Sequence, residues 1–274
     1  MKTAFITGAS SKTAVITGAS SGIGRATATR LVRLGYRVFD LSRSEVPQQG
    51  VQHIPCDVTC TETIREALRL IREQSGRIDL LLLCAGMGIA GAIEFTTEAE
   101  MHRQFDVNVY GPIRVLQAAL PLMRSQEKRG RERGRIVFVS SMAAVFSIPF
   151  QSMYSASKAA LNSYAFALRN ELKAYDIRVS CVMPGDVHTN FKRTTDLTGS
   201  EVYPHMKQAI EQMIHDEEHG LTSDQVARRV VKACTCLSPK IFYRSDLLSS
   251  LECLLQRVCS HSFACWLVGK IYHA

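Results

Sequence analysis

The sequence predicts an α/β protein with a doubly wound parallel sheet of about seven strands and helices on both faces. Continuous apolar runs, such as residues 79–83 and 177–183, are typical of strands that are buried on both sides of a parallel sheet. Amphipathic stretches such as residues 61–74 lie between them, and this alternation supplies the crossover helices that parallel strands need. The 274 residues are enough for one such domain.

The chain opens on a duplicated segment. Residues 2–11 read KTAFITGASS and residues 12–21 read KTAVITGASS, but only the second copy continues into Gly22-Ile23-Gly24. The first strand of a doubly wound sheet is central, so a duplicate strand has no vacant neighbour position. We therefore expect residues 1–11 to be a surplus tail and residues 12–274 to form a single domain.

The second copy leads into a glycine-rich loop. It follows a β-branched strand and precedes a helical pattern from Arg25 to Leu34, which is the context of a dinucleotide-binding loop. Gly18 permits a tight turn, Gly22 lets the backbone approach a pyrophosphate, and Gly24 lets the helix pack on the strand. The helix N-terminus then offers free N–H groups to the phosphates. The predicted phosphate-binding residues are Gly18, Ser20, Ser21, Gly22, Ile23 and Gly24.

Residues 134–160 bring together groups suited to proton transfer. An apolar run ends at Ser141, and a helical pattern begins near Tyr154. Tyr154 and Lys158 are four residues apart, so both side chains lie on one helix face. A phenol has an ordinary pKa of about 10, and a neighbouring ammonium favours its ionised form. The same spacing also fits a surface Tyr–Lys pair, so the interpretation depends on the rest of the chain.

Taken together, these motifs resemble the short-chain dehydrogenase/reductase family. In that family a Ser lies thirteen residues before the Tyr of a Tyr-x-x-x-Lys motif, which is Ser141 here, and the loop has the form TGxxxGxG. The resemblance covers roughly residues 12–243 and implies a Rossmann-type domain that interconverts a ketone and a secondary alcohol. The catalytic residues it implies are Asn108, Ser141, Tyr154 and Lys158.

The resemblance also implies a role for each of these residues. Tyr154 donates the proton to the carbonyl oxygen, and Ser141 positions and polarises that oxygen. Lys158 lowers the tyrosine pKa and binds the nicotinamide ribose, while Asn108 holds a water that relays protons. The implied coenzyme contacts beyond the loop are Ser42, Arg43, Asp57, Val58, Ala85, Gly86, Asn108, Tyr154, Lys158, Pro184, Gly185, Val187 and Thr189.

The coenzyme preference is predicted from the end of the second strand, residues 36–41. Aligned with the family, the acidic position that would select NAD falls on Ser42, and Arg43 follows it. A hydroxyl and a guanidinium suit a phosphate dianion, which predicts NADP. The alternative is that Asp40 contacts the ribose through a shifted register, which would favour NAD.

Two further positions carry open questions. Asp57 either contacts the adenine or caps the next helix, and Thr59 and Thr61 are alternative caps. Leu83 and Cys84 replace two Asn of the family, and a thiol is the poorer hydrogen-bonding group, which puts local stability or coenzyme affinity in doubt. His188 is expected to be a bystander, because Tyr154 supplies the proton.

The segment at residues 186–220 is expected to be a mobile substrate lid. The residues expected around the substrate are apolar and favour a lipophilic ketone, either steroid-like or an acyl-chain carbonyl, over a sugar. The alternative outside enzymes is a coenzyme-sensing regulator on the same fold. An epimerase or dehydratase is the alternative within enzymes, and it is disfavoured because the longer C-terminal domain of those enzymes is not expected here. The expected pocket residues are Met87, Ile89, Ala90, Ile93, Ala143, Val145, Phe146, Ile148, Phe150, Met183 and Phe191.

The C-terminal tail, residues 246–274, is apolar. Its longest uncharged run, residues 258–269, is well short of the ~20 residues that a membrane span needs. We favour a helix packed over the substrate mouth or at a subunit interface. Docking on a membrane surface through Phe263, Trp266 and Leu267 is the less favoured interpretation. The residues with helical spacing are Leu251, Leu254, Leu255 and Val258.

Composition excludes several other classes. Much of the net charge of +8 lies in residues 128–135, where no aromatics interleave, which indicates a solvated loop rather than a nucleic-acid site. Nine cysteines and no visible signal peptide predict reduced thiols in the cytoplasm. No second Cys/His pair accompanies Cys234 and Cys236, so no metal site is expected. A homodimer or homotetramer is expected by resemblance.

Overall fold

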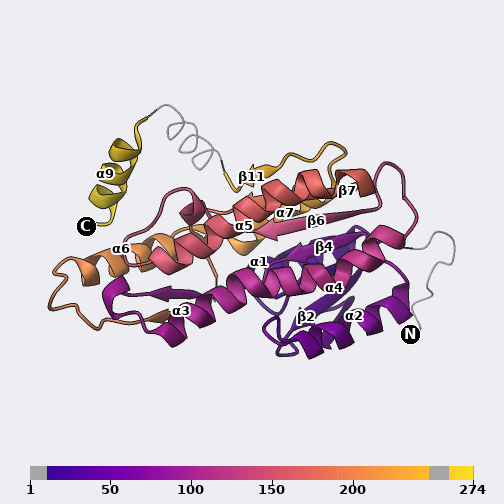
Figure 1. The fold of residues 1–274 in the computed structure, drawn as a ribbon, viewed down its shortest axis with the longest axis horizontal. Helices are drawn as coiled ribbons and strands as arrows, with labels where there is room; N and C mark the ends of the chain where they lie inside the picture. Colours follow the sequence, from indigo (N-terminus) through magenta and orange to yellow (C-terminus); the bar gives the residue numbers. More distant parts are fainter. Residues whose placement is uncertain (1–10, 190, 247–258, 274) are drawn as a thin grey trace.

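The computed structural model describes residues 11–189, 191–246 and 259–273, which form an α/β fold around one central sheet (Figure 1). All seven strands of this sheet run parallel, in the order β11-β7-β6-β4-β1-β2-β3. The predicted fold class is confirmed. The strands are β1 (Thr13–Thr17), β2 (Arg37–Ser42), β3 (Val51–Pro55), β4 (Leu80–Leu83), β6 (Gly134–Val139), β7 (Ile177–Met183) and β11 (Phe242–Arg244).

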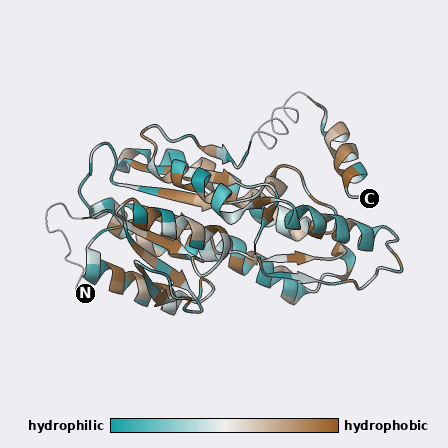
Figure 2. Ribbon diagram, turned by 180° about the vertical axis from the view of Figure 1, so that it is seen from behind, coloured by the Kyte–Doolittle hydropathy of each residue, from teal (hydrophilic) through white to brown (hydrophobic). Residues whose placement is uncertain are grey.

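Helices cover the sheet on both faces. Apolar side chains of α2, α4 and α5 pack on one face, and those of α1 and α7 pack on the other. Figure 2 shows hydrophobic residues concentrated along the central strands between these layers. The helices are α1 (Gly22–Arg33), α2 (Thr61–Ser75), α3 (Glu98–Phe105), α4 (Gly111–Ser125), α5 (Ser152–Glu171), α6 (Met206–Glu218), α7 (Ser223–Thr235) and α9 (His261–Ile271).

Beyond the carboxyl ends of the central strands lie two small parallel sheets. Strand β5 (Gly88–Ala90) pairs with β9 (Arg193–Thr195), and β8 (Val187–His188) pairs with β10 (Leu221–Thr222). Because β9 and β8 belong to the expected lid, these pairs attach that segment to the body of the domain. Helix α6 continues the same segment and packs in a separate apolar cluster with β5 and Tyr272.

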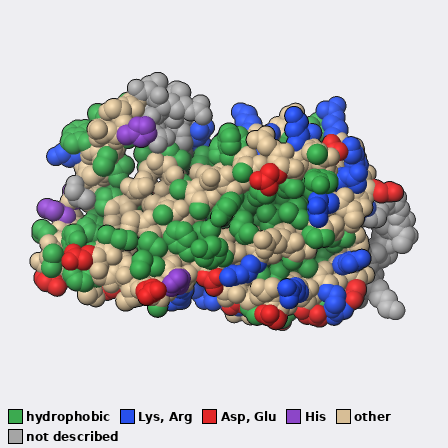
Figure 3. Space-filling view, in the orientation of Figure 1, with side chains coloured by type: hydrophobic (Ala, Val, Ile, Leu, Met, Phe, Trp, Pro, Cys, Tyr) green, Lys and Arg blue, Asp and Glu red, His purple; other side chains and the backbone are tan. Residues whose placement is uncertain are grey.

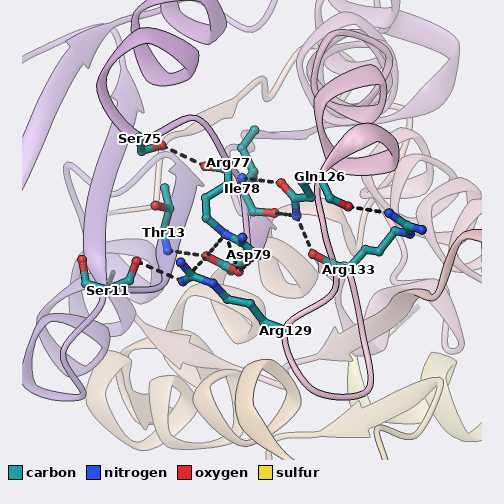
Figure 4. Close-up of polar contacts among 9 residues, drawn as sticks. All are labelled: Ser11, Thr13, Ser75, Arg77, Ile78, Asp79, Gln126, Arg129 and Arg133. Carbon is teal, nitrogen blue, oxygen red and sulfur yellow. Dashed lines mark hydrogen bonds and ion pairs between the residues drawn. The ribbon is translucent and has the colours of Figure 1, made fainter. Parts of the chain in front are cut away.

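Strand β1 comes from the second copy of the repeat and lies between β2 and β4. All five of its residues are buried. At its start the Thr13 N–H donates to Asp79 Oδ2 at 2.8 Å, and Arg77 and Arg129 pair with the same carboxylate (Figure 4). Arg129 also donates to the Ser11 carbonyl at 3.3 Å. The expected surplus tail, apart from Ser11, lies outside the described residues.

Helices α3 and α4 do not form one continuous helix. A π-helical turn at Asp106–Tyr110 joins them. Within this turn the side chain of Asn108 bonds the main chain of Met87 in a neighbouring segment. Such turns are frequent at functional sites.

Candidate active site

A cavity of about 520 Å³ opens at the carboxyl ends of the parallel strands. This is the edge at which doubly wound sheets bind their ligands. With the exception of Asn108, all the predicted site residues line it. They are Gly18, Ser20, Ser21, Gly22, Ile23, Gly24, Ser42, Arg43, Asp57, Val58, Ala85, Gly86, Ser141, Tyr154, Lys158, Pro184, Gly185, Val187 and Thr189.

The glycine-rich loop is shaped by close approaches that only glycine allows. A Cβ on Gly24 would lie 2.3 Å from the Gly18 carbonyl oxygen, so the first turn of α1 packs directly on the loop. Gly22 has φ of 50°, and its Cβ position points at Thr189, 3.5 Å away. The loop therefore lies against Thr189 at the N-terminus of α1, where backbone N–H groups suit the pyrophosphate of a dinucleotide.

Asp40 supports this loop from below, a role that sequence reasoning missed. Its side chain is buried, and Oδ1 accepts the Ala19 N–H at 2.8 Å. Oδ2 accepts the Ser42 hydroxyl at 2.7 Å and lies 3.1 Å from His53 Nδ1. The alternative that placed Asp40 on a ribose is therefore not supported, because both oxygens are engaged inside the protein.

The same network corrects the expectation for Ser42. Its hydroxyl donates to Asp40 inside the protein, so it is not directed at a phosphate in the cavity. Arg43 is exposed and lines the cavity. Of the two groups expected to recognise a phosphate, the guanidinium alone is available in this arrangement.

Asp57 closes a local turn and does not cap the following helix. Its Oδ1 accepts the Thr59 N–H at 2.9 Å and the Thr59 hydroxyl at 2.8 Å. The N-cap residue of α2 is Cys60, so the capping alternatives are wrong. Partial burial raises the pKa of Asp57, but the hydrogen bonds from Thr59 outweigh it and hold that pKa below its ordinary value.

Cys84 occupies the position of a family Asn at the end of β4. Burial raises the pKa of its thiol to about 11, while Lys158 and the Gly24 N–H lower it. The N–H groups of Cys84 and Ala85 donate to Thr17 Oγ1 at 3.0 and 3.1 Å. The hydrogen bonds to Thr17 Oγ1 thus hold the backbone at the end of β4, where the family has an Asn.

Asn108 lies just behind the cavity wall. Its side chain is fully buried, with Oδ1 accepting the Met87 N–H and Nδ2 donating to the Met87 carbonyl, both at 2.9 Å. Nδ2 also donates to Ser157 Oγ at 3.0 Å. A Cβ on Gly86 would lie 3.5 Å from both Asn108 Oδ1 and Lys158 Nζ, so these groups face the same spot.

Ser141, Tyr154 and Lys158 meet in the cavity. Ser141 lies near enough to the Tyr154 phenol to lower its pKa. The Lys158 ammonium lies 5.6 Å from the centroid of the Tyr154 ring, on the same face of α5, and donates to the Val139 carbonyl at 3.1 Å. Ser141 also caps the short turn that follows β6, where it accepts the Ala143 N–H at 3.1 Å.

The protonation equilibria differ from the expectation. Burial raises the pKa of Tyr154 to about 12, with the nearby Ser141 opposing it and the charge of Glu217 adding to it. Burial likewise lowers the pKa of Lys158. The expected lowering of the phenol pKa by Lys158 is not seen, because burial disfavours the charged form of each group, the phenolate and the ammonium.

The apolar pocket was predicted only in part. The expected residues that line the cavity are Met87, Ala143, Phe146, Ile148 and Phe191. The ring of Phe191 contacts that of Tyr154 edge to face, with centroids 5.9 Å apart. Strand pairing or core packing turns others away from the cavity, and Ile93 is exposed to solvent outside it. Those turned away are Ile89, Ala90, Val145, Phe150 and Met183.

Helix α9 and the lid supply the remaining wall. His188 lies outside the cavity, exposed, with Nδ1 2.8 Å from the Glu218 carbonyl, which fits a bystander. The apolar sequence of the tail indicated that α9 would cover the cavity. No local pattern identified the charged lining residues Lys192, Asp216 and Glu217. The lining residues that the sequence did not identify include Lys192, Thr194, Asp216, Glu217, Phe263, Leu267, Val268, Ile271 and Tyr272.

A parallel sheet of this order, a glycine-rich loop at a helix N-terminus and a Ser, Tyr and Lys in one cavity are the features of a nicotinamide-dependent oxidoreductase. The sequence model of the family described as short chain dehydrogenase matches residues 12–199, and the chain belongs to this family. It is accordingly an enzyme that acts on CH–OH or C=O groups with NAD or NADP.

Relatives and solved structures agree with this assignment. A 3-ketodihydrosphingosine reductase of Bacteroides thetaiotaomicron is 40% identical over 198 residues, which are 71% of this chain and 68% of that protein. A short-chain dehydrogenase structure from Streptomyces avermitilis superposes with a TM-score of 0.77 at 28% identity, covering 91% and 96% of the two chains. A Brucella melitensis 3-ketoacyl-(acyl-carrier-protein) reductase complexed with NADH shares the fold, with a TM-score of 0.71 at 22% identity over 85% and 96%.

Proposed function

We propose that this enzyme is an NADP(H)-dependent ketone reductase or secondary-alcohol dehydrogenase with a lipophilic substrate. The observation that carries the proposal is the convergence of Ser141, Tyr154 and Lys158 on one cavity with an apolar wall. A dinucleotide fits the other arm of that cavity, because the glycine-rich loop and the N-terminus of α1 line it. When bound, the coenzyme supplies or accepts the hydride.

The protein's own residues handle the oxygen and its proton. Tyr154 gives its proton to the carbonyl oxygen during reduction and takes it back during oxidation. Ser141, which lies beside the phenol, holds the same oxygen in place. Lys158 would contact the nicotinamide ribose, and the π-helical turn around Asn108 would leave room for a water that passes protons to solvent.

Recognition of NADP is assigned to Arg43, since Asp40 and Ser42 satisfy each other inside the protein. In Arg43→Asp, we expect the KM for NADPH to rise at least ~10-fold and that for NADH to fall or stay constant, because a charge-assisted contact is lost. Steady-state kinetics with both coenzymes measures the change. Arg65→Asp, exposed on α2 outside the cavity, is the charge-matched control. An unchanged ratio of the two KM values would show that Arg43 does not read the phosphate.

A lipophilic substrate is favoured by the apolar wall from Met142 to Ile148 and by α9 opposite it. The name of the 40% identical relative, a 3-ketodihydrosphingosine reductase, supports an acyl-chain ketone. A panel of long-chain, steroid and sugar ketones, with NADPH or NADH, tests this at the nicotinamide absorbance band. We expect the highest kcat/KM for a long-chain or steroid ketone with NADPH. Preference for a sugar would contradict the substrate class, and no turnover at all would favour a coenzyme-sensing regulator.

Assembly into a homodimer or homotetramer is proposed through α4 and α5. Large side chains are exposed on α5 and on the π-helical turn that precedes α4, namely Tyr110, Tyr164 and Phe166. Such side chains are enriched at interfaces between subunits. A cytoplasmic location stays a prediction from the cysteine content.

A further inference from the structure

Helix α9 is an apolar helix that buries none of its residues. Phe263, Leu267 and Ile271 line the cavity and are nevertheless 44%, 36% and 47% exposed. They therefore form the rim at which the cavity meets solvent. Figure 3 shows hydrophobic side chains gathered on this helix at the upper left.

These residues belong to one continuous stripe. Phe263, Trp266, Leu267 and Ile271 are spaced i, i+3, i+4 and i+8, which places them on one helix face. Trp266 is 57% exposed, and its ring lies 5.7 Å from that of Phe263. A surface helix ordinarily packs its apolar stripe against the protein, whereas α9 exposes much of its stripe to water. These four residues are called the α9 stripe below.

We propose that the α9 stripe docks on a neutral lipid bilayer, which brings the cavity mouth to the membrane surface. Trp and Phe side chains partition into the interfacial zone, and the exposed Lys270 beside them keeps its ammonium among the headgroups. Because the stripe is also the cavity rim, a lipophilic molecule reaches the cavity from the bilayer without crossing water.

The exposed area of the stripe argues against a protein partner. None of the helices in the described ranges combines the length and apolar character needed to cross a bilayer. The α9 stripe exposes on the order of 400 Å², about half of what each partner contributes to a stable protein interface. A surface-lying helix needs less area, since affinity grows with each inserted side chain.

The charge around the cavity selects the kind of bilayer. Asp216 and Glu217 of α6 line the same cavity as the stripe, but Lys192 lines it too and Arg193 pairs with Glu217, so the charges offer no net attraction for an anionic surface. Within α9 itself Lys270 is the one Lys or Arg, and no Asp or Glu is present. Binding should therefore depend on the apolar side chains and change little with added anionic lipid.

The test uses the fact that Trp266 is the only tryptophan of the chain. The full-length protein is titrated with phosphatidylcholine vesicles, without coenzyme or substrate, so the result is independent of the proposed reaction. We expect the tryptophan emission to shift to shorter wavelength and to be quenched by brominated phosphatidylcholine. Emission that is unchanged by vesicles would overturn the proposal.

Two variants distinguish binding through the α9 stripe from nonspecific binding of exposed apolar side chains to vesicles. In Trp266→Ser we expect co-sedimentation with the vesicles to fall at least ~10-fold, with unchanged circular dichroism. Leu237→Ser, at a residue that is 84% exposed and outside the cavity, should bind like the wild type. Equal losses in both variants would refute a specific docking face. A doubled mass in sedimentation that Trp266→Ser abolishes, without vesicle binding, would assign the stripe to a second copy instead.

Discussion

Tyr154→Phe is expected to lower kcat by ~10³-fold while leaving the Kd for NADPH nearly unchanged. The phenyl ring keeps the edge-to-face contact with Phe191, so the cavity keeps its shape. What is lost is the hydroxyl, beside Ser141, that exchanges a proton with the substrate oxygen. Single-turnover kinetics and NADPH fluorescence titration measure the two quantities separately.

A matched control for this variant lies on the same helix. Tyr164 is 37% exposed on α5 and outside the cavity, so Tyr164→Phe should retain wild-type kcat. If Tyr154→Phe were fully active, the proton would have to come from another group, and the proposed role of Tyr154 would be refuted. A loss of NADPH binding in Tyr154→Phe would instead indicate a structural role.

Gly24→Ala is expected to destabilise the protein by about 2 kcal/mol and to weaken NADPH binding at least ~10-fold. The added Cβ would lie 2.3 Å from the Gly18 carbonyl oxygen and 2.9 Å from its carbon, so the loop has to shift. At an unstrained helix position the same change would stabilise by about 1 kcal/mol, so the sign alone is informative.

Urea unfolding and NADPH titration measure both effects of Gly24→Ala. Gly76→Asn is a suitable control, because its C-cap position has φ of 67°, which Asn tolerates, and open space around the Cβ. We expect this control to bind NADPH normally. A Gly24→Ala protein that is more stable than the wild type, with unchanged affinity, would contradict the packing described for the loop.

The sequence was sufficient to predict the strands and the cavity position, because both follow from local patterns. Strand β7 matches the predicted range, since its apolar run is continuous and buried. The ends of parallel strands meet at one edge, so the Gly loop, Ser141 and Tyr154 were placed together correctly. The capping box of Thr222 and Gln225, which starts α7, is likewise a local pattern.

The partners of individual polar groups were not predictable in this way. Ser42 was assigned to a phosphate by its place in the strand, but its partner Asp40 is fixed only by the packing of the loop on β2. The raised pKa of Tyr154 depends on how completely the lid and α9 exclude water. Spacing along one helix shows that Lys158 is near the phenol and says nothing of the solvent around both.

The pairing of the Thr13 N–H with Asp79 has a consequence for folding of the duplicated segment. The first copy carries the same Thr at its second position and the same alternation of residues, so it could begin a central strand equally well. If the first copy formed this strand, the residues after it would be shifted by ten positions. Lys12 and Thr13 would then take the places of Gly22 and Ile23. Gly22 and Gly24 are therefore the positions that distinguish the second copy from the first, which has Lys12 and Ala14 at the equivalent places.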